Sequence, residues 1–213
     1  MRLFLFPALA ADERIFSFLG KLSDEVVFPR LAVPRPDDSM ATYASRFAKC
    51  LEVKSTDMIG GVSFGGMVAS EISCQRFTMG LILISSGLSS RSIDPMALSF
   101  GRLASKLPGK ILRSMLGSRR TFEKVFGRDQ PPLFSLARRM LDDAPDQLLI
   151  EGGRLSLNYW PVCQPLCPVH AIHGEEDRMM VPVEASDCRM VPGAGQGMVV
   201  THAEIVTEFL REV

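Results

Sequence analysis

The chain has 213 residues, a length that suits one domain with a sizeable hydrophobic core. Apolar residues make up 46% of it, charged residues 23%, and the formal net charge is zero, which excludes a disordered or strongly charged chain. No apolar run reaches the ~18 residues that a membrane span requires, and no aromatic-interleaved basic pattern predicts nucleic-acid binding.

The first 51 residues predict strands alternating with helices: strands at Arg2–Phe6 and Val26–Val33, and helices at Asp12–Leu22 and Met40–Leu51. We interpret Arg2–Phe6 as a strand and not as a signal peptide, because a single arginine precedes a very short apolar run. Pro29 interrupts the second strand. Asp38 or Ser39 is expected to cap the helix that begins at Met40.

The pentapeptide Gly61-Val62-Ser63-Phe64-Gly65 follows a predicted buried strand, Asp57–Gly60, and precedes a predicted helix, Gly66–Ile72. A serine between two glycines at a strand-to-helix turn is typical of a nucleophile elbow. The tight turn projects the serine and leaves no room for side chains two positions before or after it. The N-terminal N–H groups of the helix point back at the place where negative charge would develop. Ser63 is therefore the candidate nucleophile.

Beyond a strand at Leu81–Ile84, residues 88–162 have helical periodicity and no convincing strand. The predicted helices there are Met96–Leu107, Lys110–Leu116, Thr121–Phe126, Leu133–Leu141 and Asp146–Leu157. Strands resume at Val169–His173 and Asp187–Val191, and a helix over Thr201–Val213 closes the chain. This alternation predicts an α/β fold with a mostly parallel sheet of about six strands and helices on both faces.

Residues 88–162, called the cap below, are best placed as an insertion over the carboxyl ends of the strands, where sites lie in such sheets. From Arg91 to Arg139 there are eleven Lys or Arg against three Asp or Glu, so this segment carries about +8 and the remainder about −8. Lys106, Lys110 and Arg113 recur at helical spacing among apolar residues. Such a face is most often simply solvated, but it also suits an anionic substrate or an acidic membrane surface.

Two further stretches resemble motifs of the α/β-hydrolase superfamily. Together with the turn at Ser63 they extend the resemblance over nearly the whole chain. Leu5–Phe16 is similar to the superfamily's oxyanion loop, with Pro7-Ala8 in place of the usual His-Gly, and Pro168–Asp177 is similar to the stretch that bears its acid. The resemblance implies a core of residues 1–87 and 163–213 with the helical cap 88–162 inserted. It also implies Asp177 as the acid and the N–H groups of Leu9 and Phe64 as the oxyanion hole.

One position departs from the superfamily pattern. Gln196, in Gly195-Gln196-Gly197, stands where the catalytic histidine is expected. A glutamine amide can hold geometry but accepts no proton near neutral pH. His202, six residues on, is a doubtful substitute, because a base must lie within ~3 Å of both serine and acid. His173 is interpreted as structural.

The sequence thus predicts a serine hydrolase acting on a small carboxylic ester or thioester, apolar or anionic, whose activity Gln196 weakens. The alternative is a catalytically inactive protein of the same fold that binds a small molecule or a protein; a third reading is that residue 196 was altered from the natural one. No cofactor is indicated, and Cys163 and Cys167 lack the second Cys/His pair of a zinc site. Five cysteines without a convincing signal peptide favour reduced thiols in the cytoplasm. The oligomeric state stays open.

Overall fold

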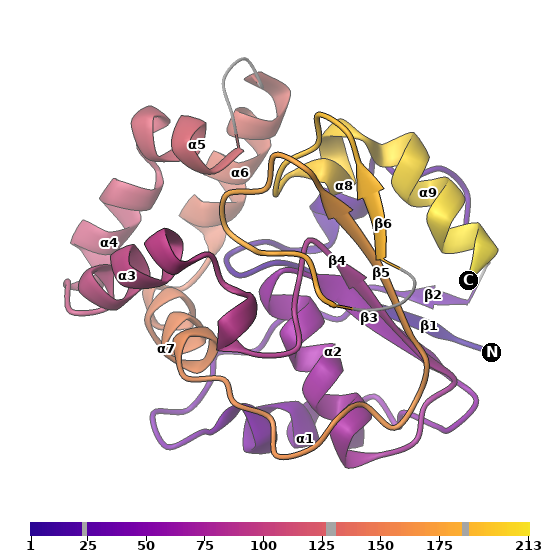
Figure 1. The fold of residues 1–213 in the computed structure, drawn as a ribbon. Coiled ribbons are helices and arrows are strands. Elements are labelled where there is room, and N and C mark those ends of the chain that lie inside the picture. Colours follow the sequence, from indigo (N-terminus) through magenta and orange to yellow (C-terminus); the bar gives the residue numbers. More distant parts are fainter. Residues whose placement is uncertain (23–24, 127–130, 185–187) are drawn as a thin grey trace.

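In the computed structural model, six parallel strands form one sheet with the order β2-β1-β3-β4-β5-β6 (Figure 1). The structure describes residues 1–22, 25–126, 131–184 and 188–213, with the backbone alone at 131–132. The strands are β1 (Leu3–Phe6), β2 (Val26–Val27), β3 (Met58–Val62), β4 (Gly80–Ile84), β5 (Val169–Gly174) and β6 (Cys188–Val191). The predicted parallel sheet is confirmed; Asp187, expected to begin the last strand, lies outside the described residues.

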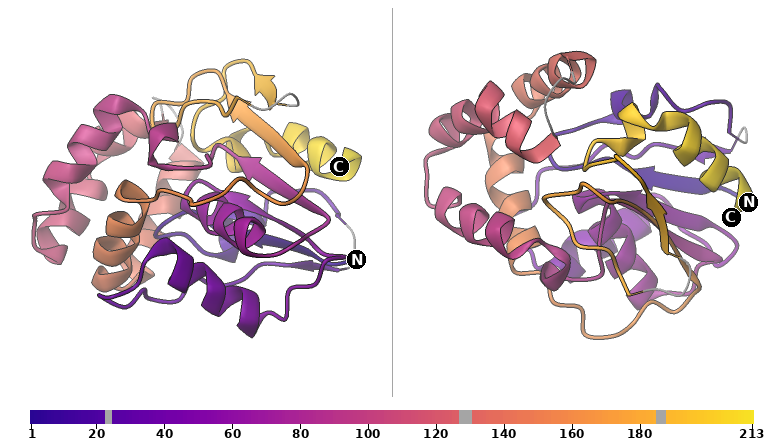
Figure 2. Two further views of the ribbon diagram at one scale, coloured as in Figure 1. Left: turned by 60° about the horizontal axis from the view of Figure 1, so that its bottom comes forward. Right: turned by 45° about the horizontal axis from the view of Figure 1, so that its top comes forward.

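Helices cover both faces of the sheet (Figures 1 and 2). The helices α1 (Met40–Cys50) and α2 (Phe64–Gln75) pack on one face, and α8 (Met198–Thr201) and α9 (Ala203–Glu212) on the other. Alternate residues of β1 supply the two layers: Phe4 and Phe6 join the cluster with α1 and α2, whereas Leu5 joins the cluster with α8 and α9. Both layers are therefore built from the two-residue period of one buried strand.

Five further helices separate β4 from β5 along the chain. They are α3 (Pro95–Ala104), α4 (Gly109–Leu116), α5 (Arg119–Phe126), α6 (Pro131–Asp143) and α7 (Asp146–Leu157). Figures 1 and 2 show them gathered at one end of the sheet, away from the N-terminus. Four buried apolar side chains form a small core of their own: Ala104, Leu112, Leu141 and Leu149. The division into core and cap at residues 88 and 162 stays a prediction.

Two predicted elements near the N-terminus are much shorter than expected, and the bounds of the closing helix also differ. The helix expected over Asp12–Leu22 is only the 3₁₀ turn η1 (Glu13–Phe16), because Ser17 Oγ donates to the Arg14 carbonyl and the N–H of Gly20 donates to Thr207 and not to a helical carbonyl. The strand expected over Val26–Val33 is two residues long and lies at the sheet edge. Pro29 has no N–H with which to continue the pairing.

The closing helix is α9, which begins at Ala203, two residues after the expected start. The unpredicted short helix α8 precedes it, separated by His202, whose backbone (φ −128°, ψ 39°) is not helical. Ser39 caps α1, as expected: its hydroxyl accepts from the N–H of Thr42, whose own hydroxyl accepts from the N–H of Ser39. Within the described part of the chain, no helix combines the length and the apolar character needed to cross a bilayer.

Candidate active site

Ser63 sits between β3 and α2 on a strained backbone, with φ 52° and ψ −119°. The strain is held by tight neighbours: a Cβ added at Gly61 would lie 2.6 Å from the carbonyl carbon of Gly65, and one at Gly65 would lie 2.3 Å from the Pro7 oxygen. Ser63 itself is half-buried. The two glycines thus satisfy the steric requirement that the sequence predicted, and they let the turn touch the end of β1.

The end of β4 supports the turn from the neighbouring strand. The N–H of Ser63 donates to the carbonyl of Ile84 at 3.1 Å, and the hydroxyl of Ser86 donates to the carbonyl of Ser63 at 2.6 Å. Ser85 is buried and has a positive φ of 44°. Sequence reasoning missed both serines, although the pair Ser85-Ser86 directly after the apolar run 81–84 is a signal that polar groups gather at this edge of the sheet.

Leu9 and Phe64 approach one another beneath the cap. The Leu9 side chain and the Phe64 ring both lie beside Gly152 of α7, where an added Cβ would be 2.4 Å from Leu9 Cδ1 and 3.7 Å from Phe64 Cζ. Neither the N–H of Leu9 nor that of Phe64 donates to a described residue. Phe64 is the first residue of α2, so its N–H carries the positive end of the helix dipole.

Asp177 follows β5 with its carboxyl fully enclosed. Its Oδ1 accepts from the N–H groups of Met179 and Met180 at 2.8 and 3.0 Å, while its Oδ2 has no hydrogen-bond partner among the described residues and lies 3.6 Å from His173 Nε2. Burial raises the pKa of Asp177. The two N–H donors, the charge of His173 and the nearby Ser85 hydroxyl lower this pKa, but burial has the larger effect. His173 Nε2 also contacts the Met180 carbonyl at 3.0 Å, in keeping with a structural role.

Gln196 lies between β6 and α8 and is only 7% exposed. Its Nε2 donates to the carbonyl of Ser85 at 3.2 Å, and its Oε1 has no partner in the described chain. The turn that carries it meets the turn that carries Asp177, because the N–H of Glu176 donates to the carbonyl of Ala194 at 2.8 Å. Gly174 permits that approach, since a Cβ there would lie 2.2 Å from the same oxygen.

The end of β4 is therefore hydrogen-bonded to Ser63 and to Gln196, and the Gln196 turn is joined to the Asp177 turn through Glu176 and Ala194. His202 is bonded elsewhere: its Nδ1 lies 2.9 Å from Thr201 Oγ1, its N–H donates to Met198 and its carbonyl accepts from Val206. In the described residues no hydrogen bond or ion pair joins His202 to Ser63 or Asp177. The same residues contain no group of three or more His, Cys, Asp or Glu side chains able to hold a metal ion.

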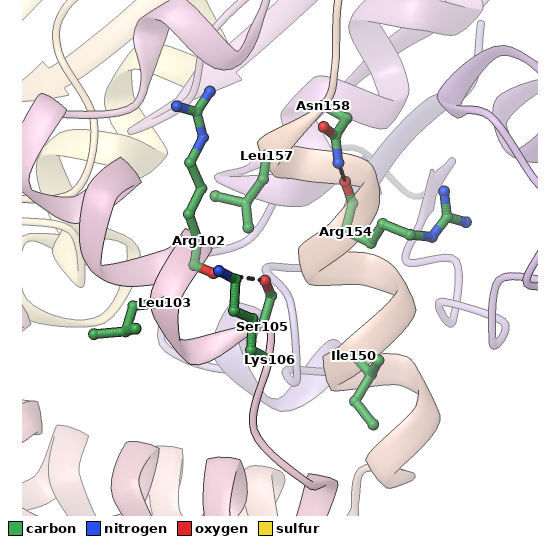
Figure 3. A pocket seen from close by; sticks show the side chains of 8 residues that line it. All are labelled: Arg102, Leu103, Ser105, Lys106, Ile150, Arg154, Leu157 and Asn158. Carbon is green, nitrogen blue, oxygen red and sulfur yellow. Dashed lines mark hydrogen bonds between the residues drawn. The ribbon is translucent and has the colours of Figure 1, made fainter.

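A cleft of about 610 Å³ lies outside this site, between α3 and α7 (Figure 3). Helix α7 separates the two places: Gly152 faces Leu9 and Phe64, whereas Ile150, Arg154 and Leu157 line the cleft. The cleft therefore belongs to the outer surface of the cap and not to the surroundings of Ser63.

No family model matches the chain, and no curated protein does. Solved structures are similar over its whole length. An enol-lactonase from Burkholderia xenovorans LB400 aligns with a TM-score of 0.78 at 12% identity, covering 99% of this chain and 90% of that one. A thermophilic esterase from Thermogutta terrifontis aligns with a TM-score of 0.73 at 18% identity, covering 100% of this chain and 88% of that one. The RedJ thioesterase from Streptomyces coelicolor aligns with a TM-score of 0.66 at 21% identity, covering 100% of this chain and 85% of that one. The chain has the α/β-hydrolase fold, as the sequence predicted.

Proposed function

We propose that this chain is a serine hydrolase that cleaves a small carboxylic ester or thioester, and that Gln196 makes it slow. The observations that carry the proposal are the strained, half-buried Ser63 at the N-terminus of α2 and the enclosed carboxyl group of Asp177 in the turn after β5. Esterase and thioesterase are also the activities named for two of the similar structures.

In the proposed reaction, Ser63 Oγ attacks the substrate carbonyl carbon and the carbonyl oxygen becomes an oxyanion. The N–H groups of Leu9 and Phe64 donate to that oxyanion, and the positive end of the α2 dipole stabilises it further. Collapse expels the alcohol or thiol and leaves an acyl group on Ser63, which water then removes. Asp177 is the acidic residue of the proposed Ser–Asp–His set, whose histidine position holds Gln196.

When Ser63 attacks, its hydroxyl proton passes to solvent water in the proposed reaction. Gln196 accepts no proton near neutral pH, and His202 makes no hydrogen bond or ion pair to Ser63 or Asp177 among the described residues, so we assign His202 no catalytic role. Loss of the histidine costs a serine protease about 10⁶ in turnover and leaves about 10³ over water from the oxyanion hole and binding. We therefore infer a hydrolase whose activity is weak, and not one with a relocated base.

An apolar substrate group fits the residues that cover the Gln196 turn. A Cβ added at Gly197 would lie 2.4 Å from Leu133 Cδ2 and 3.2 Å from Phe126 Cδ1, so α5 and α6 press apolar side chains on this turn. The positive charge of the cap adds attraction for an anionic ester. We keep the cytoplasm as the proposed location, on the cysteine pattern, and propose no cofactor and no nucleic-acid partner.

The deciding experiment is labelling of Ser63 by a fluorophosphonate probe. We expect slow labelling of the wild-type chain, none in Ser63→Ala, and labelling at least about 10²-fold faster in Gln196→His, because a histidine at 196 supplies the missing base. Wild-type protein that stays unlabelled under conditions that label Gln196→His would show that Ser63 is not a working nucleophile.

Gln196 also favours a second function, a catalytically silent α/β-hydrolase fold that binds a small molecule or a protein. Its amide is buried and donates to the Ser85 carbonyl, an arrangement that holds structure without proton transfer. In this case Ser63 serves as a hydrogen-bonding group in the binding site. Turnover of simple aryl esters by the wild-type chain, abolished in Ser63→Ala, would exclude it.

A further inference from the structure

The outward face of α3 exposes large apolar side chains. Met96, Phe100 and Leu103 are 82%, 46% and 67% exposed, and their spacing of four and three residues places them on one face of the helix. The other side of α3 is packed: a Cβ added at Gly101 would lie 2.9 Å from Leu157 of α7. The apolar face is therefore available to a partner while the helix stays anchored, and a patch of this kind marks an interaction surface.

The sequence around this face is positively charged. Between Asp94 and Glu123 there is no Asp or Glu but there are six cations: Arg102, Lys106, Lys110, Arg113, Arg119 and Arg120. Arg113 pairs with Asp146, and Arg119 with Glu123. The side chains of Arg102, Lys106 and Lys110 make no hydrogen bond or ion pair with any described residue, so three cations beside the apolar face are free to meet an anion.

The cleft between α3 and α7 combines the same two properties. Arg102 and Lys106 line it from the end of α3, and Leu103, Ile150 and Leu157 supply apolar walls (Figure 3). A molecule with an anionic head and an apolar tail would satisfy both parts of this lining. Phospholipids of negative charge have that chemistry, and they present it as a continuous surface.

We propose that the outward face of α3, together with the Lys106–Lys110 segment that follows it, docks on a membrane surface containing anionic phospholipids. The apolar side chains enter the headgroup region, and the flanking cations pair with the phosphates, as in other basic amphipathic helices that lie in a bilayer interface. Charge complementarity selects this occupant, because a neutral surface would leave the unpaired cations without partners. The proposal is independent of the proposed hydrolysis.

Vesicle flotation of the full chain tests the proposal. With vesicles of phosphatidylcholine and phosphatidylglycerol in equal parts we expect the protein to float, and with phosphatidylcholine alone we expect it to stay in solution. Each cation near the surface contributes roughly a fivefold factor, so Lys106→Gln with Lys110→Gln lowers the partition coefficient about 25-fold. Added salt lowers it too, because exposed charges are screened.

The apolar contribution needs a matched control. Phe100→Gln with Leu103→Gln is expected to lower partitioning at least about tenfold, since two large apolar side chains no longer enter the interface. Phe77→Gln with Met79→Gln removes equally exposed apolar residues just before β4, at the end of that strand opposite the cap, and is expected to change nothing. Circular dichroism of each variant confirms that it is folded.

Three results would overturn the proposal. The first is absence of flotation with anionic vesicles, and the second is flotation that the Phe77→Gln, Met79→Gln variant loses as much as the α3 variant does. The third is a dimer in sedimentation velocity that the α3 substitutions dissociate while no vesicle binding occurs, since α3 would then be an interface between two copies.

Discussion

At the scale of single residues, Ser63 stores backbone strain that the fold pays for. Its φ of 52° favours glycine, and a strained non-glycine residue costs about 1–3 kcal/mol. We predict that Ser63→Gly has a free energy of unfolding about 1 kcal/mol higher than Ser63→Ala, because alanine keeps the Cβ and the strain. Urea denaturation of the two inactive variants measures the difference. A glycine variant less stable than the alanine variant would mean that the turn is unstrained.

Asp177 supplies a second prediction at this scale. Burial raises the pKa of Asp177 in the folded chain, so the folded state binds the proton more tightly than the unfolded state. This contribution to stability falls as the pH rises from the ordinary carboxyl pKa to the raised one, and the buried charge opposes folding above it. Asp177→Asn is therefore expected to raise Tm at pH 7 by a few degrees and to have little effect below pH ~3.8. Parallel pH profiles of Tm for both proteins would contradict the assignment.

At the scale of elements, α7 of the cap contacts the proposed oxyanion loop at Gly152, and the neighbouring Gly153 faces away from it. An added Cβ at Gly152 collides with Leu9 Cδ1, whereas one at Gly153 meets nothing within 4 Å. Both substitutions to alanine favour the helix by about 0.8–1 kcal/mol. We predict that Gly153→Ala stabilises the chain and leaves fluorophosphonate labelling unchanged, while Gly152→Ala displaces Leu9 and slows labelling. Equal labelling of the two variants would show that the position of Leu9 does not influence Ser63.

At the scale of the whole molecule, the charge is divided although the net charge is zero. The segment from Arg91 to Arg139 carries about +8, and α7, which follows it in the chain, packs on Leu9 and Phe64 beside Ser63. We predict that kcat/KM of Gln196→His for an anionic aryl ester falls as ionic strength rises, because salt screens the attraction. A neutral ester of the same size is the control. The same salt dependence for both esters would mean that the cap charge does not steer substrate.

How much of this site the sequence predicts depends on how far apart along the chain the interacting residues lie. The turn at Ser63 was predictable because its steric requirement joins neighbours, Gly61 and Gly65, within five residues. The short helix α8 and the backbone break after it at His202 were not, since neither carries a clear residue signal. The helix expected over Asp12–Leu22 was too long because the N–H of Gly20 donates to Thr207, 187 residues away along the chain.

The sequence by itself determined the alternation of strands and helices, the elbow at Ser63 and the exceptional Gln196, because apolar periodicity and tight turns are properties of adjacent residues. Only the tertiary structure decided what Gln196 and His202 contact. Gln196 reaches the Ser85 carbonyl across 111 residues of chain, and His202 pairs with its neighbour Thr201. The Gln196 contact depends on which strand ends the parallel sheet brings together, and a linear pattern does not contain that information.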